Sequence, residues 1–530
     1  MRFKKLLAVV CLGVLMLSAC GNGAHNSGGG SPDSSRLQSS GSPDSGLQSS
    51  DLQSGGESQG APSAADGEVT DFSDLPVLTM AYLTSGVGSA DEALIEQELN
   101  KITGTKLGVT VDLMPVAFAE IATTINMMMS SGEKLDIIPV WQSYYPNYIA
   151  GGQLTAMDDL LDQYGQGIRE VMEGYLEAGQ SGGVQYAIPV YKSYALGTGL
   201  WYRADIAEQL GIEIPEKMTL EQLTDVLRQV KEETELIPYV PNVSGAQSYQ
   251  GLYDNLGDTL GVFTDLENCS DVENLFESSQ YKEYLDVMKI WYDEGLIYQD
   301  CVSSTEQGTN LIATGSAFAT MDSYKPGDEA TFSNKVGGYP MSYVETRAPM
   351  LTTNLVQVIQ VGIPYSCTMP DKAMAFINLM YTNPDVMNLL NWGVEGVHYQ
   401  VLEDGTIDYP DGVNAENTGW QTELNWQFGN QSIAHIWNGQ GLDLWERIRN
   451  FNDNAVKSQA FGFVWDSSAF KTQIAACNNV LSQYRTSLEF GTVDIESNLS
   501  EFNSALKSAG LDEIIAGKQQ QYDTWKASAQ

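Results

Sequence analysis

The chain has 530 residues, 42% of them hydrophobic, and its 27 Lys and Arg against 68 Asp and Glu give a formal net charge of −41. This length exceeds that of one small domain, so we expect two lobes or domains, each with a sizeable core. A surface this acidic repels phosphate backbones, which argues against a nucleic-acid partner.

The first twenty residues have the pattern of a secretion signal. Basic residues precede an apolar run, Leu6–Leu17, that is too short to be read as a membrane-spanning helix. The run ends in "LSAC", which resembles the bacterial lipobox, whose cysteine is lipidated with acyl chains such as palmitate and becomes the first mature residue. We therefore expect a signal peptide at 1–19, a lipid anchor on Cys20, and a protein at the extracytoplasmic face of the cell membrane.

A polar tether follows the cysteine. Ser and Gly make up 22 of the 40 residues from Gly21 to Gly60, and "SPDSSRLQSS" is followed by the near-repeat "SPDSGLQSS". Such a composition offers too little apolar surface to offset the entropy of ordering. We expect residues 20–70 to form the lipidated cysteine and its disordered leash.

The cysteines are far apart and show no C-x-x-C spacing, so a zinc site is not expected. Two of them belong to the signal segment, and the other four leave anything from no disulfide to two disulfides open. They are Cys11, Cys20, Cys269, Cys301, Cys367 and Cys477.

The folded part opens with an alternation of strands and helices. We expect Ser89 or Asp91 to cap the first helix and Gly104 to stop it. A β-α-β-α-β order predicts a doubly wound sheet, whose ligands sit beyond the carboxyl ends of the strands, here Tyr82–Ser85 and Trp141–Tyr145. The predicted elements are strand 76–83, helix 89–104, strand 108–116, helix 118–132 and strand 135–141.

A second α/β unit follows. "YAIPVYKSYALGTGLWYRADIAEQLGI" contains strand-like pieces around Pro189 and Gly197. Thr219 and Gln222 form a capping box at the start of the next helix, "MTLEQLTDVLRQVKEE". Further on we expect a helix in "YKEYLDVMKIWYDEGL", then helix, turn and strand in "TNLIATGSAFATMDSY", and more helices from Leu389 to the end.

The ordered set of segments resembles a known family. "YAIPVYKSYALGTGLWYRADI", "GSAFATMDS" and "VGIPYSCTMPDKAMAFINLMYTNPDVMNLLNWGVEGVHYQV" resemble family 1 extracellular solute-binding proteins, the receptors of ABC sugar importers. "TGWQTELNWQFGNQ", "AFGFVWDSS" and "SALKSAGLDEIIAGKQQQYDTW" resemble a subgroup with a C-terminal domain of unassigned function. The likeness runs in order from about Asp71 to Trp525.

The resemblance implies an α/β fold of the two-lobe periplasmic-binding-protein type II, a hinged trap in which each lobe is a doubly wound, mainly parallel sheet flanked by helices. On this template the N-lobe comprises 71–190 with 363–392. The C-lobe comprises 191–362 with 393–530, including a C-terminal helical domain. The chain is expected to cross between lobes near Pro189–Tyr202, Val358–Pro364 and Trp392–Tyr399.

The implied function is capture of a carbohydrate, expected to be an oligosaccharide, by lobe closure and its delivery to the permease subunits of an ABC transporter. We expect a monomer without a cofactor. Sugars offer an apolar face and a rim of hydroxyl groups, so aromatic platforms and convergent polar groups suit them. The aromatic candidates are Tyr82, Trp141, Tyr144, Tyr191, Tyr324 and Trp392. The polar candidates are Thr84, Ser85, Gln142, Ser143, Lys192, Ser193, Asp322 and Glu395.

An enzyme is the main rival reading. The chain has only His25, His398 and His435, and it lacks the G-x-S-x-G, P-loop and H-E-x-x-H motifs. A carboxylate pair at glycosidase separation stays open at this point. We expect a binding protein and no catalytic residues.

Three further alternatives follow from the residues. The acidic loop "EDGTIDYPDGVNAEN" does not have EF-hand spacing, so we expect a solvated loop and no metal; its oxygen-bearing residues are Asp404, Asp408, Asp411, Asn414 and Glu416. A surface adhesin or signalling receptor would share the anchor and the lobes. A receptor for peptides or other polar solutes would share the cleft as well.

Overall fold

The computed structural model describes residues 72–86, 88–242, 251–268, 270–304, 306–420 and 424–528. The predicted signal peptide, Cys20 and the tether lie outside the described residues, as does Cys269. Two large hydrophobic cores divide the folded part of the chain, and we call the parts built around them lobe 1 and lobe 2.

The sheet of lobe 1 runs in the order β2-β1-β3-β11-β6. The β1–β2 pair is parallel, a parallel bridge from Met80 to Ile137 joins β1 to the start of β3, and β11 is antiparallel to both of its neighbours. The carboxyl ends of β1, β2 and β3 therefore share one edge, and β11 begins at that edge. These strands are β1 (Val77–Thr84), β2 (Thr110–Ala117), β3 (Ile138–Trp141), β6 (Ile188–Pro189) and β11 (Ile359–Gly362).

Short hairpins and helices complete lobe 1. The hairpins pair β4 (Gln180–Ser181) with β5 (Val184–Gln185) and β12 (Gln400–Val401) with β13 (Ile407–Asp408). The α-helices are α1 (Glu92–Leu107), α2 (Ile121–Ser131), α3 (Tyr145–Ala150), α4 (Asp158–Tyr164), α5 (Gln166–Val171), α12 (Pro370–Thr382) and α13 (Pro384–Trp392). The 3₁₀ turns are η1 (Phe118–Glu120), η2 (Leu176–Gly179), η4 (Asn425–Gln427) and η5 (Gln431–Ile433).

Helix α1 differs from its prediction at both ends. It continues past Gly104 and ends at Gly108, which takes a left-handed conformation with φ +66°. Gly104 instead serves packing, since a Cβ there would lie 2.5 Å from the Phe72 ring. Asp91 occupies the N-cap position without capping through its side chain. The structure uses that carboxylate elsewhere, as described below.

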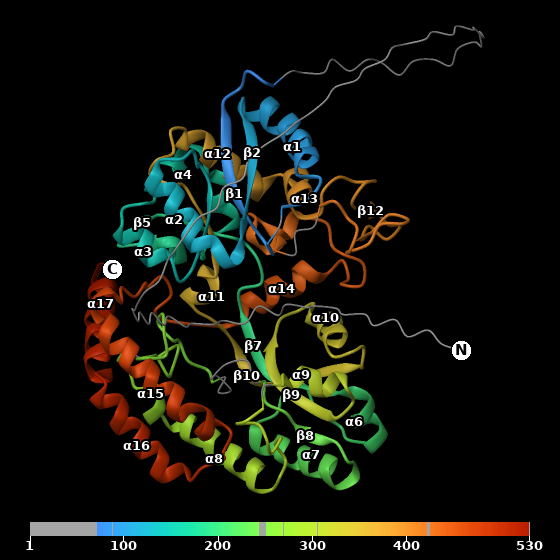
Figure 1. Ribbon diagram of the computed structural model, residues 1–530, viewed down its shortest axis with the longest axis vertical. Helices are drawn as coiled ribbons and strands as arrows, with labels where there is room; N and C mark the ends of the chain where they lie inside the picture. The colour runs from blue at the N-terminus through green and yellow to red at the C-terminus, as the bar shows by residue number, and fades with distance from the viewer. Residues whose placement is uncertain are drawn as a thin grey trace, which may run out of the picture. The chain divides into compact units, whose positions relative to one another are not determined.

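The sheet of lobe 2 has the order β14-β10-β7-β9-β8, and β7 runs between β10 and β9 (Figure 1). Its β10–β7 and β7–β9 pairs are antiparallel, whereas β8–β9 and β10–β14 are parallel. Both lobes thus have mixed sheets, so the expected mainly parallel pairing is corrected while the two-lobe α/β fold is confirmed. The strands are β7 (Leu196–Arg203), β8 (Ile237–Tyr239), β9 (Ala317–Tyr324), β10 (Met341–Leu351) and β14 (Val456–Lys457).

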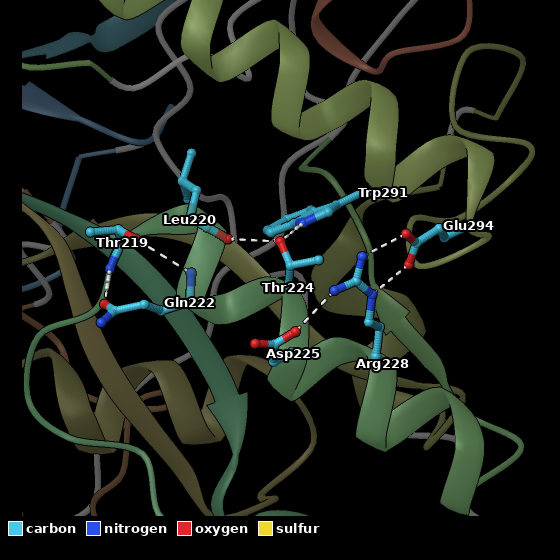
Figure 2. Close-up of polar contacts among 8 residues, drawn as sticks. All are labelled: Thr219, Leu220, Gln222, Thr224, Asp225, Arg228, Trp291 and Glu294. Carbon is cyan, nitrogen blue, oxygen red and sulfur yellow. Dashed lines mark hydrogen bonds and ion pairs between the residues drawn. The ribbon is translucent and has the colours of Figure 1, made fainter.

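The helices of lobe 2 include the predicted capped helix, α7. Thr219 accepts from the Gln222 N–H, and the Gln222 side chain accepts from the Thr219 N–H, which confirms the capping box (Figure 2). On the same helix, Arg228 forms a two-pronged ion pair with Glu294 (Figure 2). The helical elements are α6 (Ala204–Leu210), α7 (Leu220–Glu233), η3 (Leu275–Glu277), α8 (Ser279–Asp293), α9 (Gly308–Ala313) and α10 (Asp328–Lys335).

The C-terminal helices share the core of lobe 2. Leu481, Phe502 and Tyr522 belong to that core, and α15 and α16 contact α8 (Figure 1). Two buried cations tie the helices down: Arg485 pairs with Glu489, and Lys518 donates to Asp258 at 2.9 Å. The elements are η6 (Ser468–Phe470), α15 (Lys471–Glu489), α16 (Ile495–Ser508) and α17 (Leu511–Ser528).

The chain passes between the two sheets at three places. The first passage, between β6 and β7, lies within the predicted Pro189–Tyr202 crossing. The second runs from β10 to β11 through α11 (Thr353–Gln357), so it comes before β11 and not within the predicted Val358–Pro364. The third leads to β14 through α14 (Leu444–Asp453), well after the predicted Trp392–Tyr399.

The lobe boundaries consequently differ from those expected. Trp420, Phe428 and Ala434 belong to the core of lobe 1, although we expected 393–530 in the C-lobe. Strand β11 also lies in the sheet of lobe 1, although we expected 191–362 in the C-lobe. Nothing in the local apolar pattern distinguishes which of two cores a segment joins. Among the described residues, no helix has both the length and the apolar character needed to cross a bilayer.

Candidate functional site

Three aromatic rings gather where β3 ends in lobe 1. The Trp141 ring meets Phe118 edge-on with centroids 5.0 Å apart and lies 6.0 Å from the Trp426 ring. All three side chains are only partly buried, although large aromatic rings are favoured core residues. We call Phe118, Trp141 and Trp426 the aromatic platform.

Neighbouring strands fix the surroundings of the platform. Trp141 lies opposite Ile359 across the β3–β11 pair, and the Val190 N–H donates to the Ile359 carbonyl at 3.3 Å. One residue further, the Tyr191 N–H donates to Gly429 at 2.9 Å. The edge of the sheet thus brings Trp141 and Tyr191 to one side of lobe 1, next to the segment that carries Trp426.

The first crossing segment carries a tyrosine cluster. Tyr191, at 8% exposure, and the buried Tyr194 both contact the half-buried Tyr175, with centroids 6.3 and 4.8 Å from its ring. Burial, with a smaller effect of Asp453, raises the pKa of Tyr175 to about 12. Asn452 on α14 accepts from the N–H groups of Tyr194 and Ala195 at 3.0 and 2.9 Å, which holds the segment in place.

Lobe 2 contributes a second aromatic group. Tyr324, at the end of β9, stacks on Tyr343 with centroids 4.4 Å apart, and its hydroxyl donates to Glu329 at 3.0 Å. Burial, followed by the charge of Glu329, raises the pKa of Tyr324 to about 12. Phe451 on α14 meets Tyr324 edge-on at 5.8 Å. This arrangement keeps Tyr324 beside the third crossing.

A short stretch of backbone links the tyrosine cluster to the Tyr324–Tyr343 stack. Tyr324 pairs with Gly197 across the β7–β9 ladder, and Gly197 is six positions from Tyr191. Six residues extend over at most about 20 Å. The tyrosine cluster and the Tyr324–Tyr343 stack therefore border the same crossing segment.

Lys192 lies within this segment and is half-buried. Desolvation by the surrounding protein, and then the charge of Lys325 directly after Tyr324, lower the pKa of Lys192 to about 7. The neighbouring Ser193 hydroxyl is buried and forms no hydrogen bond within the described part of the chain. The side-chain oxygen of Gln142, the residue after Trp141, is also buried and accepts no hydrogen bond from the described residues.

Tyr82 does not offer a binding surface. Strand β1 runs on to Thr84, so Tyr82 lies inside the strand and is 1% exposed. Its ring contacts Trp420, and its hydroxyl donates to Glu92 at 2.5 Å. Burial together with the Glu92 contact raises the pKa of Tyr82 well above its usual range. We no longer expect this residue to touch a ligand.

The segment around His398 is a turn of lobe 1 and not a crossing. Gly393 and Gly396 adopt φ values of +88° and +79°, and His398 is 2% exposed. Its Nδ1 accepts from the Val394 N–H at 2.9 Å, and its Nε2 lies 3.2 Å from the Asp91 carboxylate. Since Nδ1 accepts, Nε2 carries the proton and donates to Asp91. His398 is thus a structural residue.

Two predicted candidates belong to this turn. Trp392 donates its indole N–H to the His435 carbonyl at 3.0 Å, and its ring lies 5.5 Å from Trp437. Glu395 is exposed and forms a β-bridge with Tyr399. These contacts belong to the packing of the 392–437 segment and give neither residue a place beside Trp141.

The remaining candidates lie at the ends of β1 and β3 or on β9. Tyr144 begins α3 and contacts Tyr148 at 6.5 Å. Asp322 on β9 accepts from Asn242 and Lys335, each at 3.4 Å. Thr84 is half-buried, whereas Ser85 and Ser143 are exposed. These positions stay predictions as ligand contacts.

The acidic loop forms local turns. Asp404 accepts from the Thr406 backbone and hydroxyl, and Asn414 accepts from the Glu416 N–H. Within the described ranges, no group of three or more His, Cys, Asp or Glu side chains is arranged to hold a metal ion.

Sequence reasoning missed three residues of the site. Phe118 follows directly after β2, so the strand-end rule that found Trp141 also points to it. Trp426 and Gln427 lie in an irregular segment that lacks such a signal. Gln427 positions the platform, because its side-chain oxygen accepts from Leu83 at 2.5 Å and its amide donates to Leu83 at 2.9 Å.

A separate pocket of about 480 Å³ has none of the platform residues in its lining. It is bordered by the β4–β5 hairpin of lobe 1 and by α17, with Gln180, Gln521 and Trp525 among its lining residues. The C-terminal helices therefore meet lobe 1 as well as lobe 2.

Two α/β lobes joined by three crossings, with aromatic rings beside the first crossing, define a two-lobe solute-binding protein of type II. Residues 83–387 match the model of the bacterial extracellular solute-binding protein family, and residues 459–527 match a domain of unknown function, DUF3502. The chain belongs to the bacterial extracellular solute-binding protein family.

Similar proteins agree with this assignment. A carbohydrate ABC transporter substrate-binding protein of Streptococcus pneumoniae is 26% identical over 468 residues, covering 86% of this chain and 92% of the relative. Lipoprotein LipO of Bacillus subtilis is 24% identical over 486 residues, covering 84% and 92%. The crystal structure of an N-glycan transport solute binding protein from Streptococcus pneumoniae superposes with a TM-score of 0.74 at 23% identity, covering 85% and 99%, and shares the fold.

Proposed function

We propose that this protein captures an oligosaccharide between its lobes and delivers it to an ABC permease. The observation that carries the proposal is the partly exposed ring cluster of Phe118, Trp141 and Trp426 at the sheet edge where type II folds bind solutes. Flat rings suit the apolar face of a sugar, and nearby polar groups suit its hydroxyls. The carbohydrate-transport relatives support this choice over peptides.

Lobe closure gives the capture its mechanism. A ligand that touches both the platform in lobe 1 and Tyr324 in lobe 2 makes its full set of contacts only when the lobes are close together. It then shifts the open–closed equilibrium by its difference in affinity for the two states. The closed state is the form that the permease recognises.

The anchor and the absence of catalysis complete the proposal. Cys20 carries the lipid that keeps the receptor at the extracytoplasmic face of the membrane, in line with the lipoprotein relative. The buried His398 is engaged on both ring nitrogens, so it is not available as a general base. We infer a monomeric binding protein that acts on no bond of its cargo.

Thermal unfolding of the full chain in detergent, against a panel of mono- and oligosaccharides with peptides as the control set, tests the proposal. A ligand at 100 times its dissociation constant adds about 2.7 kcal/mol to the free energy of unfolding. A rise in Tm with oligosaccharides alone is the expected result. A rise in Tm with peptides alone would show that the cargo is a peptide and not a sugar. No rise in Tm with any ligand would favour an adhesin or a signalling receptor.

A further inference from the structure

Lys192 has no counter-ion among the described residues of the chain. The chain carries 68 acidic side chains against 27 basic ones, so carboxylates outnumber cations. Among the residues that the structure describes, the Lys192 ammonium forms neither an ion pair nor a hydrogen bond, although the residue is half-buried. Enclosing a charge in this way lowers the stability of the folded state unless a partner compensates it.

A second positive charge acts on Lys192. Lys325 follows Tyr324 in lobe 2 and is close enough for its charge to act on Lys192. The charge of Lys325 also acts on Asp328, whose carboxylate accepts from the Lys325 N–H at 3.1 Å. A second carboxylate, that of Asp453 at the end of α14 in the third crossing, helps to raise the pKa of Tyr175. Lys192 therefore faces a repulsive neighbour across the crossing.

The backbone holds Lys192 firmly in that position. The Asn452 side chain donates to the Lys192 carbonyl at 3.2 Å and accepts from the Tyr194 N–H. The buried Ser193 hydroxyl next to it has no protein partner among the described residues. Two adjacent polar side chains are thus held beside the tyrosine cluster, and no described residue satisfies them.

We propose that Lys192, assisted by Lys325, binds an anionic group of the cargo, so that the captured oligosaccharide carries a carboxylate, as a uronic acid or a sialic acid does. This inference rests on the proposed function and names the chemical class of its cargo. The carboxylate supplies the missing counter-ion, and by lying between the two lysines it removes the repulsion between the crossing and lobe 2. Ligand charge is thereby coupled to lobe closure.

Calorimetric titration of the full chain with matched pairs of sugars tests the inference. Trigalacturonate is compared with its methyl ester, and sialyllactose with its methyl ester, so that each pair differs in the anionic group and the two arms separate the sources of the carboxylate. We expect at least one acidic member to bind tenfold or more tightly than its neutral partner. Lys192→Gln removes that preference, whereas Lys192→Arg keeps it.

Two controls separate this role from a general effect of charge or folding. Lys289→Gln on α8 removes one positive charge away from the site and leaves the preference unchanged. Titration at pH 8 in buffers of different ionisation enthalpy shows proton uptake when the acidic sugar binds the wild type and none with Lys192→Gln. A structural role for Lys192 would not produce this difference.

The outcomes distinguish the two proposals. Equal or tighter binding of the neutral members would overturn the anionic inference and leave the capture of oligosaccharides standing. A preference that persists in Lys192→Gln would overturn the role of Lys192. If no saccharide binds in any arm, both proposals fail.

Discussion

Gln427 holds Leu83 with both ends of its side-chain amide, as a neighbouring strand would with its backbone. Its oxygen accepts from the Leu83 N–H at 2.5 Å and its nitrogen donates to the Leu83 carbonyl at 2.9 Å, although 344 positions separate the two residues. The contact fastens the segment that carries Trp426 to the end of β1. One amide side chain thus sets the position of one ring of the aromatic platform.

Gln427→Ala is expected to lower the free energy of unfolding by about 1–3 kcal/mol, because it leaves two buried backbone groups of Leu83 without partners. It also weakens ligand binding, since Trp426 loses its support. Urea unfolding followed by circular dichroism, together with ligand titration, measures both effects. Gln483→Ala on the exposed surface of α15 is the control; a loss no larger than that of the control would contradict the positioning role.

Trp141→Ala is expected to weaken binding of the cargo more than about tenfold, because it removes the central ring of the platform. The lobes stay folded, since the side chain is only partly buried. Titration and circular dichroism check both statements. Trp525→Ala on α17, which removes another partly exposed indole, provides the matched control. Unchanged affinity in Trp141→Ala would remove this residue from the site.

His398→Ala is expected to destabilise lobe 1 by about 1–3 kcal/mol, because the buried Val394 N–H loses its acceptor and Asp91 loses its donor. Ligand affinity at a temperature where the variant is folded stays as in the wild type. Thermal and urea unfolding measure the first effect. His435→Ala keeps the backbone contacts of residue 435 and is expected to cost less. A fall in affinity without a fall in stability would instead assign His398 to the binding site.

The pH dependence of binding follows from Lys192. Its pKa is lowered to about 7 in the free protein by desolvation and by Lys325, and a bound anion raises that pKa again. Affinity for an acidic sugar is therefore constant below pH 7 and falls as the pH rises above 7, by at most tenfold per pH unit. Titrations from pH 5.5 to 9 measure the profile.

In the unliganded protein, Lys192 makes the free energy of unfolding rise with pH, whereas it makes the affinity for an acidic sugar fall. Between pH 7 and the ordinary pKa of lysine, the unfolded chain binds more protons at this position than the folded chain, so the contribution of Lys192 to stability rises with pH across that window. Lys192→Met removes this slope and raises the Tm at pH 6.5. A flat binding profile with a wild-type Tm in the variant would contradict the reasoning.

Cys20→Ala is expected to release the protein from the membrane, because the lipid is the anchor we propose. Fractionation of cells, with detection of the protein in membranes and medium, measures the change. Ser18→Thr is a mild substitution in the same segment and leaves the protein with the membranes. Membrane association that persists in Cys20→Ala would exclude lipidation of Cys20 as the anchor.

The strands and helices of both lobes were predictable where the local pattern is strong. Strand β1 and the capping box of α7 lie within a residue or two of their predictions, because alternation and capping depend on neighbouring residues only. The direction of β11 between β3 and β6 was not predictable, since a short apolar run has the same pattern in either orientation. The lobe that a late segment joins is set by long-range packing, which placed Trp420 against Tyr82.

The residues of the candidate site were likewise predictable only where a local sequence pattern marks them. Trp141 was predicted because it ends a strand, and Phe118 follows the same rule. The prediction that Tyr82 contacts the ligand was wrong because β1 continues two residues past it. Trp426 depends on the Gln427–Leu83 contact, and no local pattern reveals a pairing over 344 positions.

The place of β11 also fixes the order in which lobe 1 assembles during synthesis. This strand joins β3 to β6, yet it is made more than two hundred residues after β3 and more than a hundred and fifty after β6. The sheet therefore stays incomplete until residue 362 has left the ribosome, and its core waits further for Phe428 and Ala434. Pairing between segments so far apart in sequence is slow, because a long loop has to close first. A chain that reaches its native state late stays unfolded for most of its synthesis. Passage through a narrow membrane channel requires an unfolded chain.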